Sequence, residues 1–228
     1  MRKEMKSLAI LSGVGMLFAS LLGAADASVK KDSRKLGDVF YIYTDRGSRL
    51  NHYIPSGWMG DYGDLKLNPA WGEGVKKPEK GMSKEDVQAV KSKEDKDTCI
   101  QIKYTAERKQ GAGWAGIYWQ HPANNWGDKR GGFDLTKFRK LSFWARGEKG
   151  GEVVDKFFIG GITGQTEEGD SDEAAISPVE LTKDWKKYEI DLAGLDLSHI
   201  IGGFGFAANG DANPDGFTIY IDEIKLAR

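Results

Sequence analysis

One loop of this sequence combines an aromatic ring with amides in a way that suits sugar binding. Residues 121–128 place Trp126 directly after Asn124 and Asn125, and a proline and a glycine in the same segment are typical of turns. The apolar C–H face of a pyranose ring stacks on an indole, and side-chain amides hydrogen-bond its hydroxyl groups. The segment therefore predicts a binding loop; the alternative is that Trp126 folds over the end of the domain.

A second segment, residues 55–64, has the same character. Its aromatic rings are spaced by glycines, and the carboxylate of Asp61 follows Trp58 by three residues. We expect Trp58 to stack on a ligand and Asp61 to hydrogen-bond the ligand from a loop. The alternative is that these aromatic rings only cover the core.

Two more candidates lie on a predicted strand. Residues 114–120 alternate, so that Ile117 and Trp119 point to one face of the strand and Tyr118 and Gln120 to the other. One of the two faces must lie in the core. We expect Ile117 and Trp119 to be buried, and Tyr118 and Gln120 to face a binding groove.

A third aromatic site is the pair Trp144 and Arg146. On a predicted strand these two residues alternate away from Phe143 and Ala145 and therefore point to the opposite face. The pair is either a binding surface or a surface that a loop covers. Trp185, which begins another predicted strand, is expected to contribute to packing.

Acidic residues near the C-terminus suggest calcium. Asp211, Asn213 and Asp215, with Asp222 at the twelfth position, have the spacing of an EF-hand loop. The flanking segments alternate like strands, however, and a turn rich in Asn, Asp and Gly needs no metal. In the last strand the apolar alternation changes parity at Asp222-Glu223, which predicts a bulge that re-aims the Asp222 side chain.

The sequence contains few features that are typical of a catalytic site. The three histidines lack the spacing of a metal site, and no nucleophile elbow or phosphate-binding loop occurs. Tyr118, Gln120 and His121 are similar to strand residues with which jelly-roll polysaccharide lyases abstract a proton beside a uronic carboxylate. The match covers only these residues. An enzyme, either a lyase or a hydrolase, is therefore the lesser alternative to a protein without catalytic activity.

Strands must position all of these residues. Apolar alternation with a period of two recurs along the chain, separated by clusters of Gly, Asn and Asp, and no window has a sustained helical period. This pattern and the thirty glycines predict an all-β fold, a two-sheet antiparallel β-sandwich of the jelly-roll type. The predicted strands are 39–44, 87–91, 99–105, 114–120, 140–146, 156–160, 185–192, 203–207 and 217–226.

The N-terminus has the order of a secretory signal. Basic residues precede an apolar run over residues 8–22, and Ala25 and Ala27 have the small-x-small spacing of a cleavage site. The run is shorter than the ~20 residues of a membrane-spanning helix. We therefore expect a signal peptide over residues 1–27, a single domain over residues 28–228, and a secreted or periplasmic protein without a membrane span.

The charge balance excludes some partners. The formal net charge is −1, and removal of the signal with its three basic and two acidic residues makes it −2. Such a balance gives no electrostatic reason to expect nucleic acid or an anionic membrane as a partner.

Cys99 has no second cysteine with which to form an intramolecular disulfide, and its apolar neighbours predict a buried, inert thiol.

Four stretches together resemble the galactose-binding-like jelly roll, namely residues 113–120, 133–147, 184–192 and 219–224. Within that superfamily they are most similar to non-catalytic carbohydrate-binding modules such as the family 11 type. The resemblance lies in the pattern of strands and turns and supports the fold more than the function. It implies a sandwich whose concave sheet or loop rim binds glycan, with a structural calcium near the termini.

The resembling modules carry a calcium-ligating aspartate in the last strand, at the position that Asp222 matches here. Asp45, which follows the first predicted strand, is the expected partner. We thus expect an exported, non-catalytic protein that recognises a polysaccharide through loop and groove aromatics. The alternative is a structural or assembly protein of the cell envelope that uses the same face for contacts with a protein partner.

Overall fold

The computed structural model describes residues 37–72, 74, 97–163 and 168–228. The expected signal peptide and the expected strand at 87–91 lie outside the described residues. Among the residues that are described, no helix is long and apolar enough to cross a bilayer. The unit formed by residues 36–228 is all-β, as the alternation predicts.

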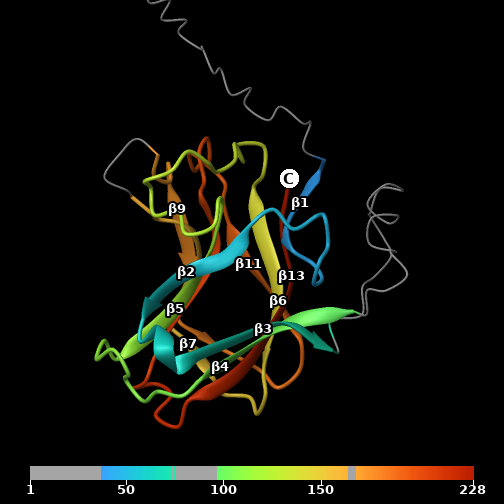
Figure 1. Cartoon of the computed structure of the whole chain (residues 1–228). Helices are drawn as coiled ribbons and strands as arrows, with labels where there is room; N and C mark the ends of the chain where they lie inside the picture. The colour runs from blue at the N-terminus through green and yellow to red at the C-terminus, as the bar shows by residue number, and fades with distance from the viewer. Residues whose placement is uncertain (1–36, 73, 75–96, 164–167) are drawn as a thin grey trace, which may run out of the picture. The chain divides into compact units, whose positions relative to one another are not determined.

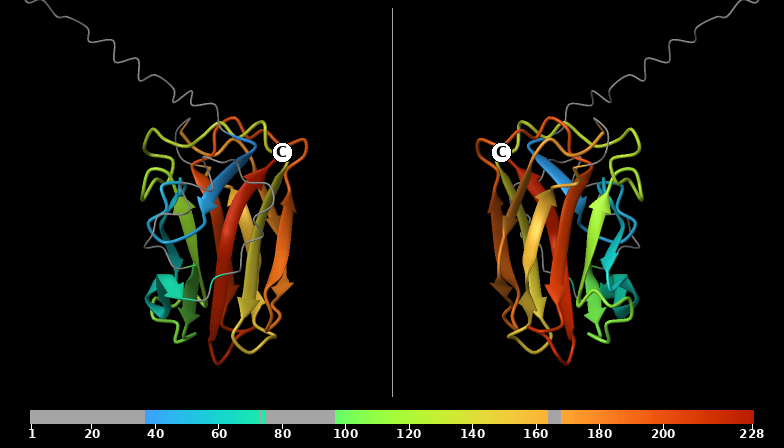
Figure 2. Two further views of the ribbon diagram at one scale, coloured as in Figure 1. Left: turned by 90° about the vertical axis from the view of Figure 1, so that its right-hand side faces the viewer. Right: turned by 90° about the vertical axis from the view of Figure 1, so that its left-hand side faces the viewer.

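One sheet, here called sheet A, has six strands that pair antiparallel (Figure 1). Five of them follow the order β11-β6-β13-β4-β3, and β1 pairs with β13. Figure 2 shows β1 (blue) beside β13 (red), the strand that ends the chain. The strands are β1 (Val39–Tyr43), β3 (Leu65–Gly72), β4 (Thr98–Tyr104), β6 (Lys140–Gly147), β11 (Lys186–Asp191) and β13 (Phe217–Ala227).

The second sheet, sheet B, has five antiparallel strands in the order β2-β5-β12-β8-β9. Its strands are β2 (Ile54–Gly60), β5 (Trp114–Gln120), β8 (Lys156–Gly160), β9 (Glu173–Ile176) and β12 (Gly202–Asn209). A small ribbon pairs β7 (Val153–Val154) with β10 (Val179–Glu180), and a short 3₁₀ turn, η1, covers Tyr62–Asp64.

The core lies between the inner faces of the two sheets. Large aromatic rings fill it: the centroid of Phe204 on β12 lies 5.1 Å from that of Phe143 on β6 and 5.3 Å from that of Trp119 on β5. These three side chains have no exposed surface. Successive side chains of a strand point to opposite faces. The residues that flank each of these core side chains along its strand therefore lie on the outer faces of the sandwich.

Most predicted strands are confirmed, but residues 55–64 are not simply a loop. Residues 54–60 form β2, which pairs with β5 at the edge of sheet B. Pro55 and Gly57 obscure this strand in the sequence because both residues have low strand propensity. The pairing accommodates them with a shift in register between Pro55 and Gly57. β3, β7, β9 and β10 are also strands that the alternation did not predict.

The bulge expected in the last strand is present. The register of β13 against β6 shifts between Asp222 and Lys225, and Glu223 has a φ of +50°. Ile221 before the bulge and Ile224 after it both lie in the core. The irregularity therefore keeps apolar side chains inward while it turns the acidic pair at 222–223 out of the regular alternation.

Candidate functional site

The outer face of sheet B carries the strand residues that the sequence singled out. Ile117 and Trp119 of β5 are fully buried in the core, as expected, so Tyr118 and Gln120 belong to the outer face. Tyr118 packs there in a second apolar cluster with Phe158, Ile162, Ile201 and Ala207, and Met59 lies against this cluster. The outer face of sheet B is therefore partly apolar. An outer face that only meets solvent is usually polar in an antiparallel sheet.

Tyr118 and Trp126 form one aromatic platform. Their ring centroids lie 5.9 Å apart with the rings perpendicular, and Trp126 is 42% exposed. Phe158 of β8, on the far side of β12, packs edge-on against Tyr118, with 4.7 Å between the ring centroids. Gly205 of β12 makes this possible, since a Cβ at that position would overlap the Phe158 ring. The exposed indole thus rests on a fixed aromatic base.

The hydroxyl group of Tyr118 is already engaged. It donates a 2.9 Å hydrogen bond to the carbonyl oxygen of Gly160. Burial of the ring, followed by the nearby carboxylates of Asp170 and Glu173, raises the pKa of Tyr118. Tyr118 is consequently neutral at physiological pH, and what it offers to a ligand is ring surface.

Gln120 is an internal strut and has no exposed surface. Its Nε2 donates to the carbonyl oxygen of Asn125 at 2.8 Å, and its Oε1 accepts from the hydroxyl of Ser56 at 3.0 Å. The Ser56 hydroxyl also accepts the backbone N–H of Asn124 at 2.9 Å. These contacts join β5, β2 and the loop that follows β5, so Gln120 positions the loop and does not reach solvent.

Asn125 organises the loop from inside and is also fully buried. Its Oδ1 accepts the backbone N–H groups of Gly127 at 3.0 Å and Lys129 at 3.3 Å, as in an Asx turn. Its Nδ2 donates to the carbonyl oxygen of Lys129 at 2.9 Å. Asn124, by contrast, is exposed and has a φ of +55°, a conformation that asparagine tolerates. Of the two amides, only Asn124 faces solvent beside Trp126.

Asp61 also differs from its expected role, because it has no exposed surface. Its carboxylate accepts three backbone hydrogen bonds, from Gln110 and Ala112 at 2.9 Å and from Gly113 at 2.6 Å. Burial alone would raise the pKa of Asp61, but the backbone donors outweigh burial and lower it. Asp61 is an anionic anchor for the loop that leads into β5.

Trp114, at the other end of β5, was not singled out from the sequence. It is 40% exposed and borders a recess of about 300 Å³ together with Asp155, Lys156, Ser177 and Ala207. Trp114 has the same parity as Tyr118, so the alternation that placed Tyr118 on the outer face already places Trp114 there. Polar groups at the recess are held in place: Asn209 Nδ2 donates to Asp155 Oδ1 at 2.7 Å.

Trp58 does not join this surface, although it is 39% exposed. In the β2–β5 ladder it pairs with Ile117, a core residue, whereas Met59 pairs with Gly116. Met59 belongs to the outer apolar cluster. Trp58 therefore leaves the edge strand β2 on the side opposite to Met59, away from Trp126 and Tyr118.

A family model for carbohydrate binding domain 30 matches residues 62–228, which is more than half of the chain. The chain belongs to this family. It is therefore a non-catalytic carbohydrate-binding module with a jelly-roll fold, as the sequence led us to expect. The expected likeness to family 11 is confirmed only at this coarser level, since the matching family is family 30.

Several solved structures of carbohydrate-binding modules are similar to this chain. A family 30 module is 15% identical, with a TM-score of 0.51, over 83% of this chain and 98% of that chain. A family 30 module of a cellulosomal cellulase of Clostridium thermocellum is 16% identical, with a TM-score of 0.49, over 83% and 96%. A family 11 module from the same organism, in complex with a β-1,3-1,4-mixed-linked tetrasaccharide, is 17% identical, with a TM-score of 0.40, over 76% and 96%. No curated protein matches.

Two loops of the module border the aromatic platform and are tied to each other. The Asp170 carboxylate accepts the backbone N–H groups of Ile162 at 2.8 Å and Ile201 at 2.6 Å. The imidazole of His199 lies between the carbonyl oxygens of Gly169, 2.7 Å from Nδ1, and Gly131, 3.0 Å from Nε2. Through His199, the end of the loop that carries Trp126 is therefore joined at Gly131 to the neighbouring loop at Gly169.

The residues that resemble a lyase set do not converge in the module. Tyr118 donates to a backbone carbonyl and Gln120 is buried in the loop network. The His121 ring instead stacks at a tilt on Phe133, with 4.4 Å between the ring centroids. Burial, followed by the neighbouring His52, lowers the pKa of His121. This arrangement supplies a framework for the loop and no shared point for proton abstraction.

The two aspartates expected to bind calcium are both buried, near the hydroxyl of Tyr43. Burial, and also the carboxylates of Asp222 and Asp45, raise the pKa of Tyr43. Asp45 Oδ1 accepts the backbone N–H of Thr98 at 3.0 Å. A Cβ at Gly74 would meet Asp222 Oδ2 at 2.8 Å and the Thr98 carbonyl oxygen at 3.1 Å, so these two oxygens converge.

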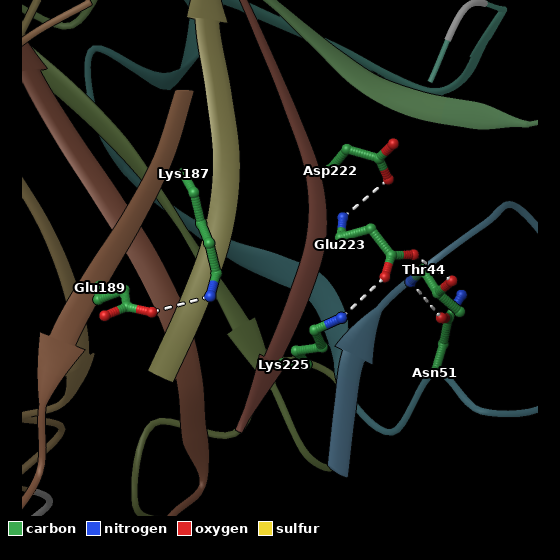
Figure 3. Close-up of polar contacts among 7 residues, drawn as sticks. All are labelled: Thr44, Asn51, Lys187, Glu189, Asp222, Glu223 and Lys225. Atoms are coloured by element: carbon green, nitrogen blue, oxygen red, sulfur yellow. Dashed lines mark hydrogen bonds and ion pairs between the residues drawn. The ribbon is translucent and has the colours of Figure 1, made fainter. Parts of the chain in front are cut away.

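Figure 3 shows the neighbouring polar contacts of the bulge. Asp222 Oδ1 accepts the backbone N–H of Glu223 at 2.8 Å, and the Glu223 carboxylate binds the Thr44 hydroxyl at 2.7 Å and Lys225 Nζ at 3.2 Å. Within the described part of the chain, no three His, Cys, Asp or Glu side chains cluster in a way that could hold a metal. The oxygen atoms at Asp222 that could act as metal ligands belong to carboxylates and to a backbone carbonyl group. Ca²⁺ prefers ligands of this kind.

Proposed function

We propose that this module binds a polysaccharide chain along the outer face of sheet B. One sugar ring stacks on Trp126 over Tyr118, and another stacks on Trp114 beside the recess. Tyr118 and Trp114 are four residues apart on one strand, about 13 Å at about 3.3 Å per residue, which suits an extended ligand more than a single sugar. The observation that carries the proposal is the exposed indole of Trp126, 5.9 Å from the Tyr118 ring.

Polar selection would fall to side chains that reach solvent along the same face. Asn124 stands beside Trp126, and Lys156 and Asp155 stand at the recess beside Trp114. Gln120, Asn125 and Asp61 act one step removed, because they position the loops that carry the two tryptophans. This division fits binding sites in general, where a few oriented polar groups accompany apolar surface.

Affinity electrophoresis of the purified protein through gels that contain different polysaccharides tests the proposal. We expect one or a few neutral glycans to retard the protein without product formation, and we expect Trp126→Ala to abolish most of the retardation. Unchanged mobility in every gel would refute the proposal. A complex with an envelope protein that persists in excess soluble glycan would favour the alternative, a structural or assembly role of the same face.

We further propose a structural calcium at the Asp222 site. The carboxylates of Asp222 and Asp45 and the carbonyl oxygen of Thr98 would hold the ion. Further oxygen ligands would complete the coordination number of about six to eight that Ca²⁺ takes. Support comes from the burial of both carboxylates and from the convergence of oxygens beside Gly74. A cation there would offset the repulsion between the carboxylates and would join β1, β4 and β13.

Export is the last part of the proposal. The signal-like order of residues 1–27, the cleavage pattern at Ala25 and Ala27 and the glycan ligand together support a secreted or periplasmic protein. Mass spectrometry of the protein from its own cells tests this. A mature chain that starts at Ser28 is expected, and an intact Met1 in the cell interior would contradict export.

A further inference from the structure

The outer face of sheet A carries a second aromatic surface, on the opposite side of the sandwich from Trp126. Ala145 and Phe143 of β6 are core residues, so Trp144 and Arg146 point outward, as the alternation predicts. Arg146 pairs in register with Tyr220 of β13, and Tyr220 pairs with Gln101 of β4. Polar and aromatic side chains thus form one row across the middle of the sheet.

Aromatic rings fix the guanidinium of Arg146. It lies 3.9 Å from the centroid of the Tyr220 ring and 5.3 Å from that of Trp185. Trp71, which is 37% exposed, continues the row, with its ring centroid 6.1 Å from that of Tyr220. A guanidinium stacked on an aromatic face keeps its donors in the plane of the group, where they are oriented for a second ligand.

The hydrogen-bonding capacity of Arg146 is largely unused. Among the described residues its one hydrogen bond runs from an Nη to the carbonyl oxygen of Gly147 at 3.3 Å, and no described carboxylate lies within ion-pair distance. The nearby lysines differ in this respect. Lys187 binds Glu189 at 2.8 Å, as Figure 3 shows, Lys140 binds the same carboxylate, and Lys225 binds Glu223. Among the described residues, Arg146 is therefore a cation of this face that aromatic rings hold in place and that forms no ion pair.

From this geometry we propose that the outer face of sheet A is a second saccharide site, and that its ligand is a uronate-containing polysaccharide. The carboxylate of a uronic residue matches the planar donors of Arg146, because a guanidinium binds a carboxylate through two parallel hydrogen bonds. Indole surface for the sugar ring comes from Trp185, 5.3 Å from the guanidinium, and from Trp144, which points outward two residues away on β6. Gln101, whose Nε2 lies 3.3 Å from the Tyr220 hydroxyl, adds a polar group to the row.

The test compares two ligands with the same sugar ring. The purified protein is run through gels that contain polygalacturonate or its fully methyl-esterified form, in which the carboxylate is blocked. We expect retardation by polygalacturonate, weaker retardation by the ester, and loss of about tenfold or more in affinity for polygalacturonate in Arg146→Ala. Arg146→Lys should be intermediate, since lysine keeps the charge without the planar pair of donors.

Arg49→Ala is the matched control. Arg49 is an exposed loop arginine, so its replacement removes the same charge without touching the row of aromatic rings. Equal loss in Arg49→Ala and Arg146→Ala, equal binding of the esterified polymer, or full binding by both Arg146 variants would overturn the proposal. Retardation of Arg146→Ala by neutral glycans should be unchanged, and this arm separates failure of the sheet B proposal from failure of this one.

Discussion

The backbone N–H of Asp61 donates a 2.7 Å hydrogen bond to the carbonyl oxygen of Trp114, while the Asp61 carboxylate holds the N–H groups of Gln110, Ala112 and Gly113. A buried acid thus fixes the start of β5, where an exposed tryptophan borders the recess. The carboxylate does not touch the ligand surface itself. Its influence on binding runs through the placement of Trp114.

This arrangement predicts a pH dependence of stability. Because the folded-state pKa of Asp61 lies below its unfolded value of about 3.9, its contribution is present above that value and is lost as pH falls through the lowered pKa. Asp61→Asn should therefore lower Tm most at neutral pH, and the difference from the native protein should shrink in acid. Thermal unfolding from pH 7 to pH 2 measures it; a difference that is constant with pH would contradict the assignment.

The positions of Trp114, Trp126 and Trp58, on or beside β5, predict which substitution weakens glycan binding most. Trp126→Ala and Trp114→Ala should each weaken binding of the retarding glycan by about tenfold or more, which is about 1.4 kcal/mol, because each removes an aromatic ring that the bound glycan would cover. Trp58→Ala should have a smaller effect, because Trp58 leaves β2 on the other side. Isothermal titration of the three variants decides this, and a larger loss in Trp58→Ala than in Trp126→Ala would move the site to the β2 edge.

The fold could be predicted from the sequence because inside and outside follow a period of two. The ends of β5 and β8 coincide with the predicted ones, and Ile117 and Trp119 are buried as expected. β2 was missed, since only its pairing with β5 makes a strand of a segment that contains Pro55 and Gly57.

The candidate site was predicted less completely. The roles of Gln120 and Asn125 depend on the loop folding back over the end of β5, which is a tertiary contact that no local pattern contains. Whether an amide faces solvent or spans a loop depends on what packs above it. Trp114 is different, because its parity with Tyr118 was visible in the sequence.

The platform under Trp126 depends on a glycine, which gives a stability prediction. A Cβ at Gly205 would overlap the Phe158 ring, so Gly205→Ala should displace that ring from Tyr118 and destabilise the fold by about 1–3 kcal/mol. Gly72→Ala is the control, since nothing lies within 4 Å of its Cβ position in β3. Urea unfolding measures both variants, and equal effects would show that crowding at Gly205 is relieved at no cost.

Calcium at Asp222 predicts a stability that depends on the ion. A ligand that binds only the folded state at about 100 times its dissociation constant adds about 2.7 kcal/mol, so a chelator should lower Tm and added Ca²⁺ should restore it. Asp222→Asn should lower the Tm in Ca²⁺ and remove the response to chelator, because the site loses a charged ligand. Asp215→Asn is the control, since it would abolish the response only if the EF-hand-like spacing held the ion. A Tm that chelator leaves unchanged in the native protein would rule out a stabilising calcium at either place.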